Sequence, residues 1–163
     1  MKTSHKYWMA LSALLLIGIY FVPIWSISMD APQYPEGIGM NITINNIEGK
    51  KVQDLDTING LNHYIGMKKI VPSSIPELSL MPYIFGLFII SGLIIALIGK
   101  RKLIIAWLSA FVVVAIAGLV DFYIWGYDYG HNLSPDAPIK VPGMSYQPPL
   151  FGTKQLLNIT ATS

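Results

Sequence analysis

Three long apolar stretches constrain this chain more than any other feature of its sequence. They run from about Tyr7 to Ser28, from about Leu80 to Gly99 and from about Leu103 to Trp125. A helix needs about 20 mostly apolar residues to cross the hydrocarbon core of a bilayer, and each stretch has that length. Of the 163 residues, 53% are apolar and only 12% are charged. The sequence therefore predicts a membrane all-α protein with three transmembrane helices.

Basic residues predict the orientation of these helices. The positive-inside rule places clusters of Lys and Arg in the cytoplasm, so the N-terminus is expected inside and the C-terminus outside. The cluster residues are Lys2, Lys6, Lys100, Arg101 and Lys102. The expected organisation is an N-terminal flank and first helix (1–28), an outer loop of about 50 residues (29–79), a tight helical hairpin (80–125) and a Pro-rich outer tail of about 38 residues (126–163).

The first stretch also has an alternative interpretation as a cleaved signal peptide. It follows basic residues, and Ser26-Ile27-Ser28 has the small-x-small pattern of a cleavage site. Its apolar run is longer than that of a usual signal peptide, so an uncleaved anchor is favoured. In a bacterium this topology corresponds to the inner membrane, with most of the polar mass in the periplasm.

The two outer segments contain only short structural signals. Met40 to Ile44 alternates as a strand does, and Asp54 to Met67 is a candidate helix that begins near Asp56 or Thr57. In the tail, prolines favour an extended and irregular chain. They are Pro135, Pro138, Pro142, Pro148 and Pro149. Such a tail has to lie on the protein's own outer loop or on a partner, and the small size of the outer region favours a partner.

Composition excludes several classes of function. The chain has no cysteine, which removes disulfides, thiolate metal sites, iron–sulfur clusters and cysteine nucleophiles. A net charge of +2 is too small to indicate nucleic-acid binding. No histidine lies inside a predicted span, which removes a transmembrane haem with two His ligands. We find no catalytic motif, and the sequence predicts a protein that is not an enzyme.

A first candidate metal site combines His63 and Met67. The two residues are four apart, so a helix would place both side chains on one face. Imidazole and thioether together suit Cu(I), which is a soft ion. Packing is the more common reason for such a pair, because methionine often fills gaps in a core.

A second, weaker candidate lies around the outer end of the third stretch. If the helix continues past Trp125, Asp121 and Asp128 are two turns apart on one face, and His131 follows Asp128 by three residues. Carboxylate and imidazole groups at this spacing suit copper or zinc, or a proton relay. The alternative is a belt of aromatic residues at the headgroup level. Its members would be Tyr123, Trp125, Tyr127 and Tyr129.

Four segments of the sequence resemble those of a known family. They are Asp30–Gly37, which contains Glu36; Ile58–Met67; Asp121–Tyr123 with Tyr127–Leu133; and Ile139–Met144. Together they look like the small three-helix membrane proteins encoded beside clade II nitrous-oxide reductases. The resemblance covers most of the chain, including both outer segments.

The resemblance implies a context in denitrification more than a mechanism. The neighbours of this family include the copper enzyme that reduces nitrous oxide, a copper-delivery lipoprotein and a transporter for enzyme maturation. It supplies no catalytic residues, and it favours copper as the cofactor at His63, Met67, His131 and Met144, which lie in the matching segments.

Three hypotheses for function follow from these observations. The first is a non-catalytic accessory protein that interacts with a periplasmic copper reductase, or with its maturation proteins, and anchors it to the lipid bilayer. The second is a periplasm-facing protein that handles Cu(I) through His and Met ligands. The third is a small subunit of a membrane oxidase or monooxygenase, with its metal at Asp121, Asp128 and His131.

Overall fold

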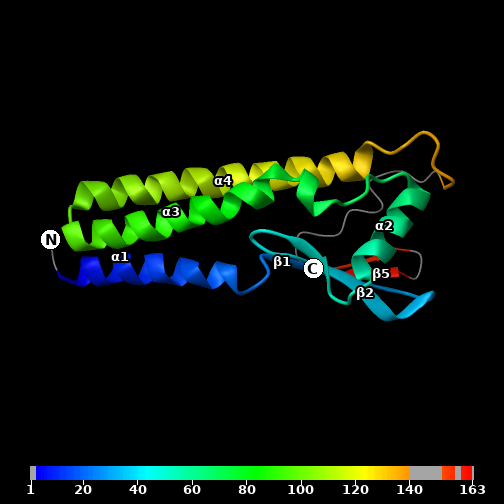
Figure 1. Cartoon of the computed structure of the whole chain (residues 1–163), viewed down its shortest axis with the longest axis horizontal. Helices are drawn as coiled ribbons and strands as arrows, with labels where there is room; N and C mark the ends of the chain where they lie inside the picture. Colours follow the sequence, from blue (N-terminus) through cyan, green and yellow to red (C-terminus); the bar gives the residue numbers. More distant parts are fainter. Residues whose placement is uncertain (1–2, 140–151, 157–158, 163) are drawn as a thin grey trace.

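The chain folds into two parts, which we call the stem and the head (Figure 1). The stem consists of helices that lie side by side, and the head is a β-sheet with a helix packed on it. The computed structural model describes residues 3–139, 152–156 and 159–162. Its helices and strands are α1 (Thr3–Leu15), the 3₁₀-helix η1 (Leu16–Tyr20), β1 (Trp25–Ala31), β2 (Tyr34–Ile42), β3 (Ile47–Gly49), α2 (Asp54–Ile65), the 3₁₀-helix η2 (Pro72–Ser74), α3 (Pro76–Ile98), α4 (Arg101–His131), β4 (Thr153–Leu156) and β5 (Ile159–Thr162).

Two helices of the stem, α3 with 23 residues and α4 with 31, are long and apolar enough to cross a membrane. Many of their large apolar side chains are exposed, for example Leu87, Val113 and Leu119. At a rise of 1.5 Å per residue, α3 is roughly 35 Å long, compared with a hydrocarbon core of about 30 Å. An exposed apolar surface of this extent marks contact with lipid or with another protein.

The prediction of three transmembrane helices in an all-α protein is wrong. In the described part of the chain two helices qualify as spans, and the head contains a five-stranded sheet. The first apolar stretch, Tyr7 to Ser28, divides into the 13-residue helix α1, the short η1 and the start of strand β1. It divides because its apolar pattern changes from a helical period to alternation, and Trp25, Ile27 and Met29 all pack into the core of the head.

Small residues allow α1 and α3 to pack closely in the stem. A Cβ added at Gly92 of α3 would lie 2.8 Å from the Cβ of Ala13 in α1. Ala96, one turn further along α3, is buried in a cluster with Trp107 of α4. The Nε1 of Trp107 donates a hydrogen bond to the carbonyl oxygen of Phe88, 3.1 Å away. Glycine and alanine at such positions are typical of helix contacts in membranes.

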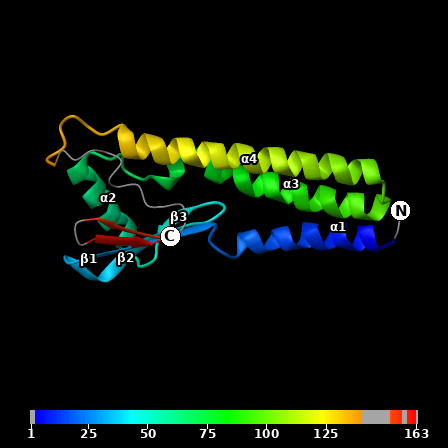
Figure 2. The same cartoon turned by 180° about the vertical axis from the view of Figure 1, so that it is seen from behind.

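The N-terminus and the turn between α3 and α4 lie at the same end of the stem, and the head lies at the other end (Figure 2). The Nζ of Lys6 donates a hydrogen bond to the carbonyl oxygen of Leu97, 3.0 Å away. Gly99 ends α3 with a φ of 72°, a left-handed conformation that favours glycine. The predicted tight hairpin is thus confirmed, and the basic residues Lys6 and Lys100–Lys102 gather at the end opposite the head.

Helix α3 begins earlier than the sequence predicts. The expected start near Leu80 would place Pro82 in the first turn, but α3 begins at Pro76 and Pro82 lies inside it. The hydroxyl of Tyr20 in η1 donates a 2.5 Å hydrogen bond to the carbonyl oxygen of Pro82. This bond ties the end of η1 to the second turn of α3.

The sheet of the head is antiparallel and has the order β3-β2-β1-β5-β4. Strand β5 pairs with β1, so that Ser28 lies opposite Thr162 and Asp30 opposite Thr160. The prediction of an irregular tail is wrong for its end, which forms the strands β4 and β5, and β5 pairs with β1 of the same chain. Proline does not interrupt this ladder, because Pro142, Pro148 and Pro149 precede both strands and lie outside the described residues.

The core of the head lies between the sheet, α2 and the end of α4. The strands contribute alternating residues, as the pattern at Met40–Ile44 predicts, and α2 contributes Ile58. Helix α4 continues six residues beyond the predicted end of its span, and Phe122, Trp125 and Tyr129 pack against this core. The rings of Trp25 in β1 and Phe122 meet edge to face, with centroids 4.9 Å apart.

Buried polar side chains attach α2 to its neighbours. The predicted helix Asp54–Met67 is confirmed up to Ile65, where Gly66 ends it with a φ of 80°. The buried carboxylate of Asp54 accepts a hydrogen bond from the backbone N–H of Gly39 in β2, at 2.9 Å. The buried amide of Asn59 bonds both backbone groups of Ile70, at 3.0 and 2.7 Å.

We expect Gly92→Leu to destabilise the stem, because its side chain would overlap α1. Overpacking of this kind costs about 1–3 kcal/mol. The measurement is the thermal unfolding midpoint of the chain in detergent. Gly118→Leu in α4 is the matched control, since a Cβ at Gly118 meets no atom within 4 Å. An equal loss in both variants would contradict close packing at Gly92.

We expect Asn59→Ala to destabilise the head by about 1–3 kcal/mol, because it leaves the backbone groups of Ile70 unpaired. Gly60→Ala, at the next and exposed position of α2, should instead stabilise the helix by about 0.5–1 kcal/mol. Denaturant unfolding of both variants, followed by circular dichroism, provides the comparison. A neutral Asn59→Ala would show that the paired hydrogen bonds do not hold the segment.

Candidate functional site

Asp128 and His131, two of the three predicted site residues of α4, lie in its last turns, where the helix meets the segment that follows α2. We call this region the outer joint. The Nζ of Lys68 lies 2.5 Å from the carboxylate of Asp128. The hydroxyl of Tyr129 donates to the carbonyl oxygen of Lys69 at 3.2 Å. Two backbone bonds add to these contacts, from Ser134 N to Gly66 O (2.8 Å) and from Ile139 N to Tyr64 O (3.1 Å).

The two carboxylates of α4 do not form a chelating pair. Both lie on one continuous helix, because α4 continues past the predicted end at Trp125, but seven residues separate them by about 10.5 Å along its axis. A carboxylate oxygen binds a metal at about 2.0–2.2 Å, so one ion cannot reach both groups. Asp121 is exposed, whereas Asp128 accepts hydrogen bonds from Lys68 and Asn132. The carboxylate of Asp128 therefore has a structural role in the outer joint.

His131 is the last residue of α4, and its ring is oriented by one neighbour on the same helix, Tyr127. Its ring stacks on that of Tyr127, with centroids 3.7 Å apart and planes within 12°. Its Nδ1 lies 2.9 Å from the carbonyl oxygen of Tyr127, and it must donate there because a carbonyl only accepts. The Nε2 atom is left as the ring position available to a ligand.

His63 and Met67 are not on one helical face. His63 lies in the last turn of α2 and is exposed, but the helix ends at Ile65 and Met67 follows the left-handed Gly66. The backbone N–H of Met67 returns to the carbonyl oxygen of Asn62, at 2.8 Å. The helical spacing that suggested a Cu(I) pair therefore does not extend to the methionine.

No group of three or more His, Asp or Glu residues that could hold a metal ion occurs among residues 3–139, 152–156 and 159–162. Met144, the fourth residue proposed for copper, lies outside the described residues. Asp128 and His131 both lie in the last turns of α4 at the outer joint, whereas His63 is exposed on the surface of α2. Copper at His63, Met67, His131 and Met144 stays a prediction.

The head has an open groove at the edge of its sheet, which we call the distal groove. It has a volume of about 570 Å³ and lies between β2 and the first turn of α2. Strand β3 covers β2 only at Met40–Ile42, so the segment Tyr34–Ile38 has no ladder partner on this side within the described chain. The Nζ of Lys51 donates to the carbonyl oxygens of Glu36 (2.7 Å) and Gly37 (2.9 Å) there.

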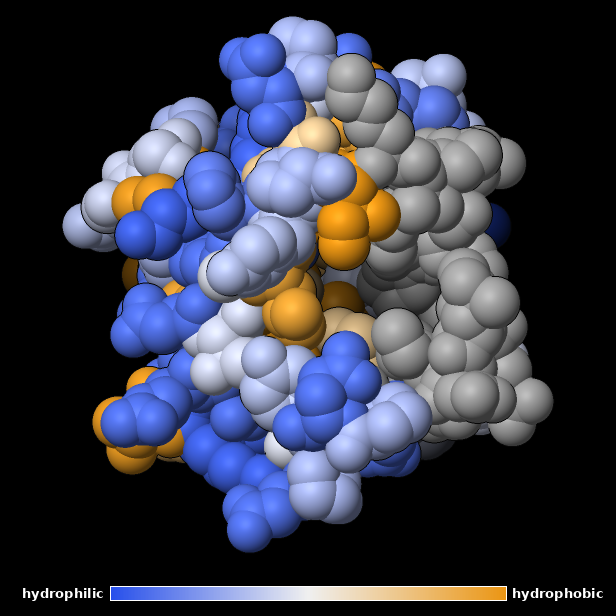
Figure 3. All heavy atoms as spheres, turned by 90° about the vertical axis from the view of Figure 1, so that its right-hand side faces the viewer, coloured by the Kyte–Doolittle hydropathy of each residue, from blue (hydrophilic) through white to orange (hydrophobic). Residues whose placement is uncertain are grey.

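The distal groove is bordered by Val52, whose side chain is fully exposed at 100%. Figure 3 looks onto the end of the head that faces away from the stem, where hydrophilic residues dominate and apolar residues gather in a central strip. Such a composition is shared by non-obligate interfaces and by ordinary protein surface, so it does not by itself mark a binding site.

Sequence patterns did not reveal the residues that hold these sites together. The ion pair between Lys68 and Asp128 joins positions 60 residues apart, and no local spacing indicates it. Asn59 is different, because a polar side chain on the apolar face of a helix is a signal that sequence reading can use.

In comparisons with known proteins, no family model, no curated protein and no solved structure matches this chain. The interpretation of its sites therefore depends on their own geometry and on the arrangement of stem and head.

We expect Lys68→Glu to loosen the outer joint, because it places two carboxylates against each other. Faster hydrogen exchange of the backbone amides in residues 64–70 is the measurement. The double exchange Lys68→Glu with Asp128→Lys should restore the slow rate, since it keeps the pair with its charges reversed. Equal exchange rates in all three chains would contradict a role for the ion pair.

Proposed function

We propose that this chain is a non-catalytic membrane-anchored accessory protein that docks a periplasmic partner at the bacterial inner membrane. The partner is a copper reductase, or one of its maturation proteins, as the resemblance to proteins encoded with nitrous-oxide reductases implies. On this proposal the partner binds the copper, and this chain holds the partner at the membrane.

The continuity of α4 is the observation that carries this proposal. The helix runs without interruption from Arg101, at the basic end of the stem, to His131 in the head. Phe122, Trp125 and Tyr129 of its outer part are packed against the head core. Because the head is packed on a helix that also forms the stem, its orientation relative to the stem is fixed. A partner bound to the head is therefore held at a fixed distance from the membrane.

The arrangement of charge supports an outward head. Lys6 and Lys100–Lys102 lie at the end of the stem opposite the head. The positive-inside rule assigns that end to the cytoplasm, which directs the head to the periplasm.

The distal groove is the proposed docking surface. It lies at the free edge of β2, where an extended segment of a partner could add backbone hydrogen bonds to the sheet. Pro35 and the Lys51 side chain occupy part of this edge, which limits pairing between copies of this chain. A partner segment therefore has to displace Lys51 from the carbonyl oxygens of Glu36 and Gly37.

The test is site-specific photo-crosslinking in native membranes. We expect a photoreactive residue at Val52 to crosslink to the copper reductase or to a maturation protein, identified by mass spectrometry. The same residue at Ser73, which is exposed but outside the distal groove, is the control.

Deletion of the chain should also release the reductase from washed membranes into the soluble fraction. Equal crosslinking at Val52 and Ser73, or a reductase that stays on the membrane without this chain, would count against docking.

A further inference from the structure

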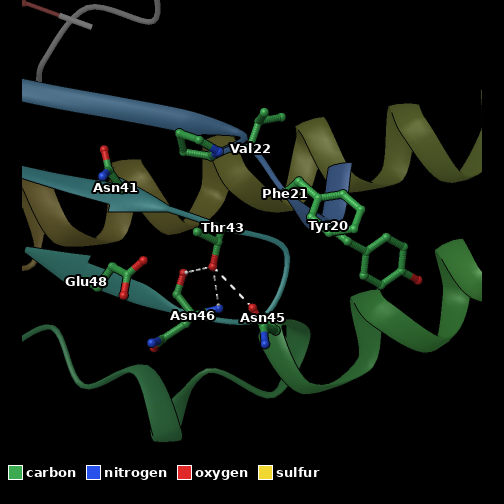
Figure 4. A pocket seen from close by; sticks show the side chains of 9 residues that line it. Tyr20, Phe21, Val22, Asn41, Thr43, Asn45, Asn46 and Glu48 are labelled. Atoms are coloured by element: carbon green, nitrogen blue, oxygen red, sulfur yellow. Dashed lines mark hydrogen bonds between the residues drawn. The ribbon is translucent and has the colours of Figure 1, made fainter. Parts of the chain in front are cut away.

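A second groove lies where the stem joins the head, and we call it the junction groove (Figure 4). It has a volume of about 430 Å³. One wall is the connection from η1 to β1, with Phe21 and Val22. The other wall is the turn between β2 and β3 and the outer face of those strands, with Asn41, Asn45 and Glu48. The groove is therefore apolar on the stem side and polar on the head side.

The level of this groove along the stem matches a membrane interface. Tyr20, at the end of η1, bonds the carbonyl oxygen of Pro82 in the second turn of α3. Tyr83, next to that bond, is 78% exposed on the stem surface. Phe21 is 82% and Val22 57% exposed although both are large and apolar. Exposed aromatic and apolar residues at one level mark the boundary between hydrocarbon and headgroups.

The polar wall presents amide N–H groups. The Oδ1 of Asn46 accepts the backbone N–H of Ile47 at 2.9 Å, which directs its Nδ2 outward. The Oδ1 of Asn41 accepts from Ser26 at 2.8 Å, and that of Asn45 accepts from Thr43 at 3.2 Å. Within the described part of the chain these bonds occupy the amide oxygens and leave the Nδ2 groups as donors. Such donors suit the oxygens of a phosphate.

One carboxylate stands beside these donors. Glu48 of β3 lies opposite Asn41 of β2 in the ladder, so both side chains are neighbours on the same outer face. Among the described residues that line the groove there is no Lys or Arg. A ligand with a phosphate alone would meet the charge of Glu48 without compensation, whereas a ligand that also carries an ammonium group would neutralise it.

We propose that the junction groove binds the headgroup of a zwitterionic aminophospholipid, of the phosphatidylethanolamine class. The phosphate accepts hydrogen bonds from the Asn41, Asn45 and Asn46 amides, and the primary ammonium donates to Glu48. The acyl chains lie against Phe21 and Val22 on the stem side. The site is independent of the distal groove and does not require the docking function.

This chemistry distinguishes three common headgroups. Phosphatidylglycerol has no cation for Glu48. Phosphatidylcholine has a cation without N–H groups, and therefore cannot donate a hydrogen bond to the carboxylate. The phosphatidylethanolamine headgroup supplies both an anion and a donor cation, two carbon atoms apart.

The test uses the full chain, purified in detergent free of phospholipid and mixed with equal amounts of the three lipids carrying identical acyl chains. Native mass spectrometry then measures the lipid that each protein retains. We expect the wild type to retain phosphatidylethanolamine about tenfold more than the other two lipids, as one charge-assisted hydrogen bond allows. Glu48→Gln should remove this preference.

Asn45→Asp is the second test variant, because it keeps the oxygen that Thr43 contacts and replaces the N–H donor by a charge. It should also lower retention of phosphatidylethanolamine. Glu36→Gln is the matched control, since it removes another exposed carboxylate of the head, outside the junction groove. Circular dichroism and the unfolding midpoint confirm that each variant is folded.

Three outcomes would overturn the proposal. They are equal retention of the three lipids by the wild type, an unchanged preference in Glu48→Gln, and the same loss in Glu36→Gln as in Glu48→Gln. Free phosphoethanolamine at millimolar concentration should not displace the lipid, because it lacks the acyl chains. Complete displacement would assign the groove to a soluble ligand and also overturn the lipid assignment.

Discussion

The packing of the outer part of α4 into the head is the interaction on which the rest of the structure depends. Phe122, Trp125 and Tyr129 belong to a helix whose earlier turns are exposed along the stem, yet they contact the core formed by the sheet and α2. Without these contacts, stem and head would be connected mainly by the η1–β1 connection and the segment around η2. The aromatic contacts and the outer joint, with Lys68 and Asp128, therefore join the stem and the head into one body.

The apolar pattern of the first stretch changes where the chain passes from the stem to the head. Up to Tyr20 the apolar residues are helical, and from Trp25 they alternate between the two faces of a strand. In a helix, each backbone group forms its hydrogen bonds within the same segment. From Trp25 onward, the backbone N–H and C=O groups instead form hydrogen bonds with neighbouring strands. The side chains of Trp25, Ile27 and Met29 then form one face of the head core.

Local sequence patterns predicted the α3–α4 hairpin, most of α2 and the alternation in β2 correctly, because each of these depends on residues close in sequence. The five-stranded sheet was missed, since pairing such as that of Ser28 with Thr162 has no local signature. Among the candidate site residues, Asp121 and Asp128 lie on one helix because α4 continues past its predicted end at Trp125, whereas Gly66 ends α2 before Met67. The partners of Asp128 could not be predicted, because Lys68 reaches it only through the fold.

The position of β1 in the sheet has a consequence for biosynthesis. Strand β1 leaves the stem early in the chain and pairs on one side with β2 directly, but its other side pairs with β5, which is made after both long helices. Such distant pairing is slow to form, and until then β1 presents an open edge that could join another chain. Assembly of the head is therefore a late step, completed only after α3 and α4 are in place and the segment with β5 has reached the same side of the stem.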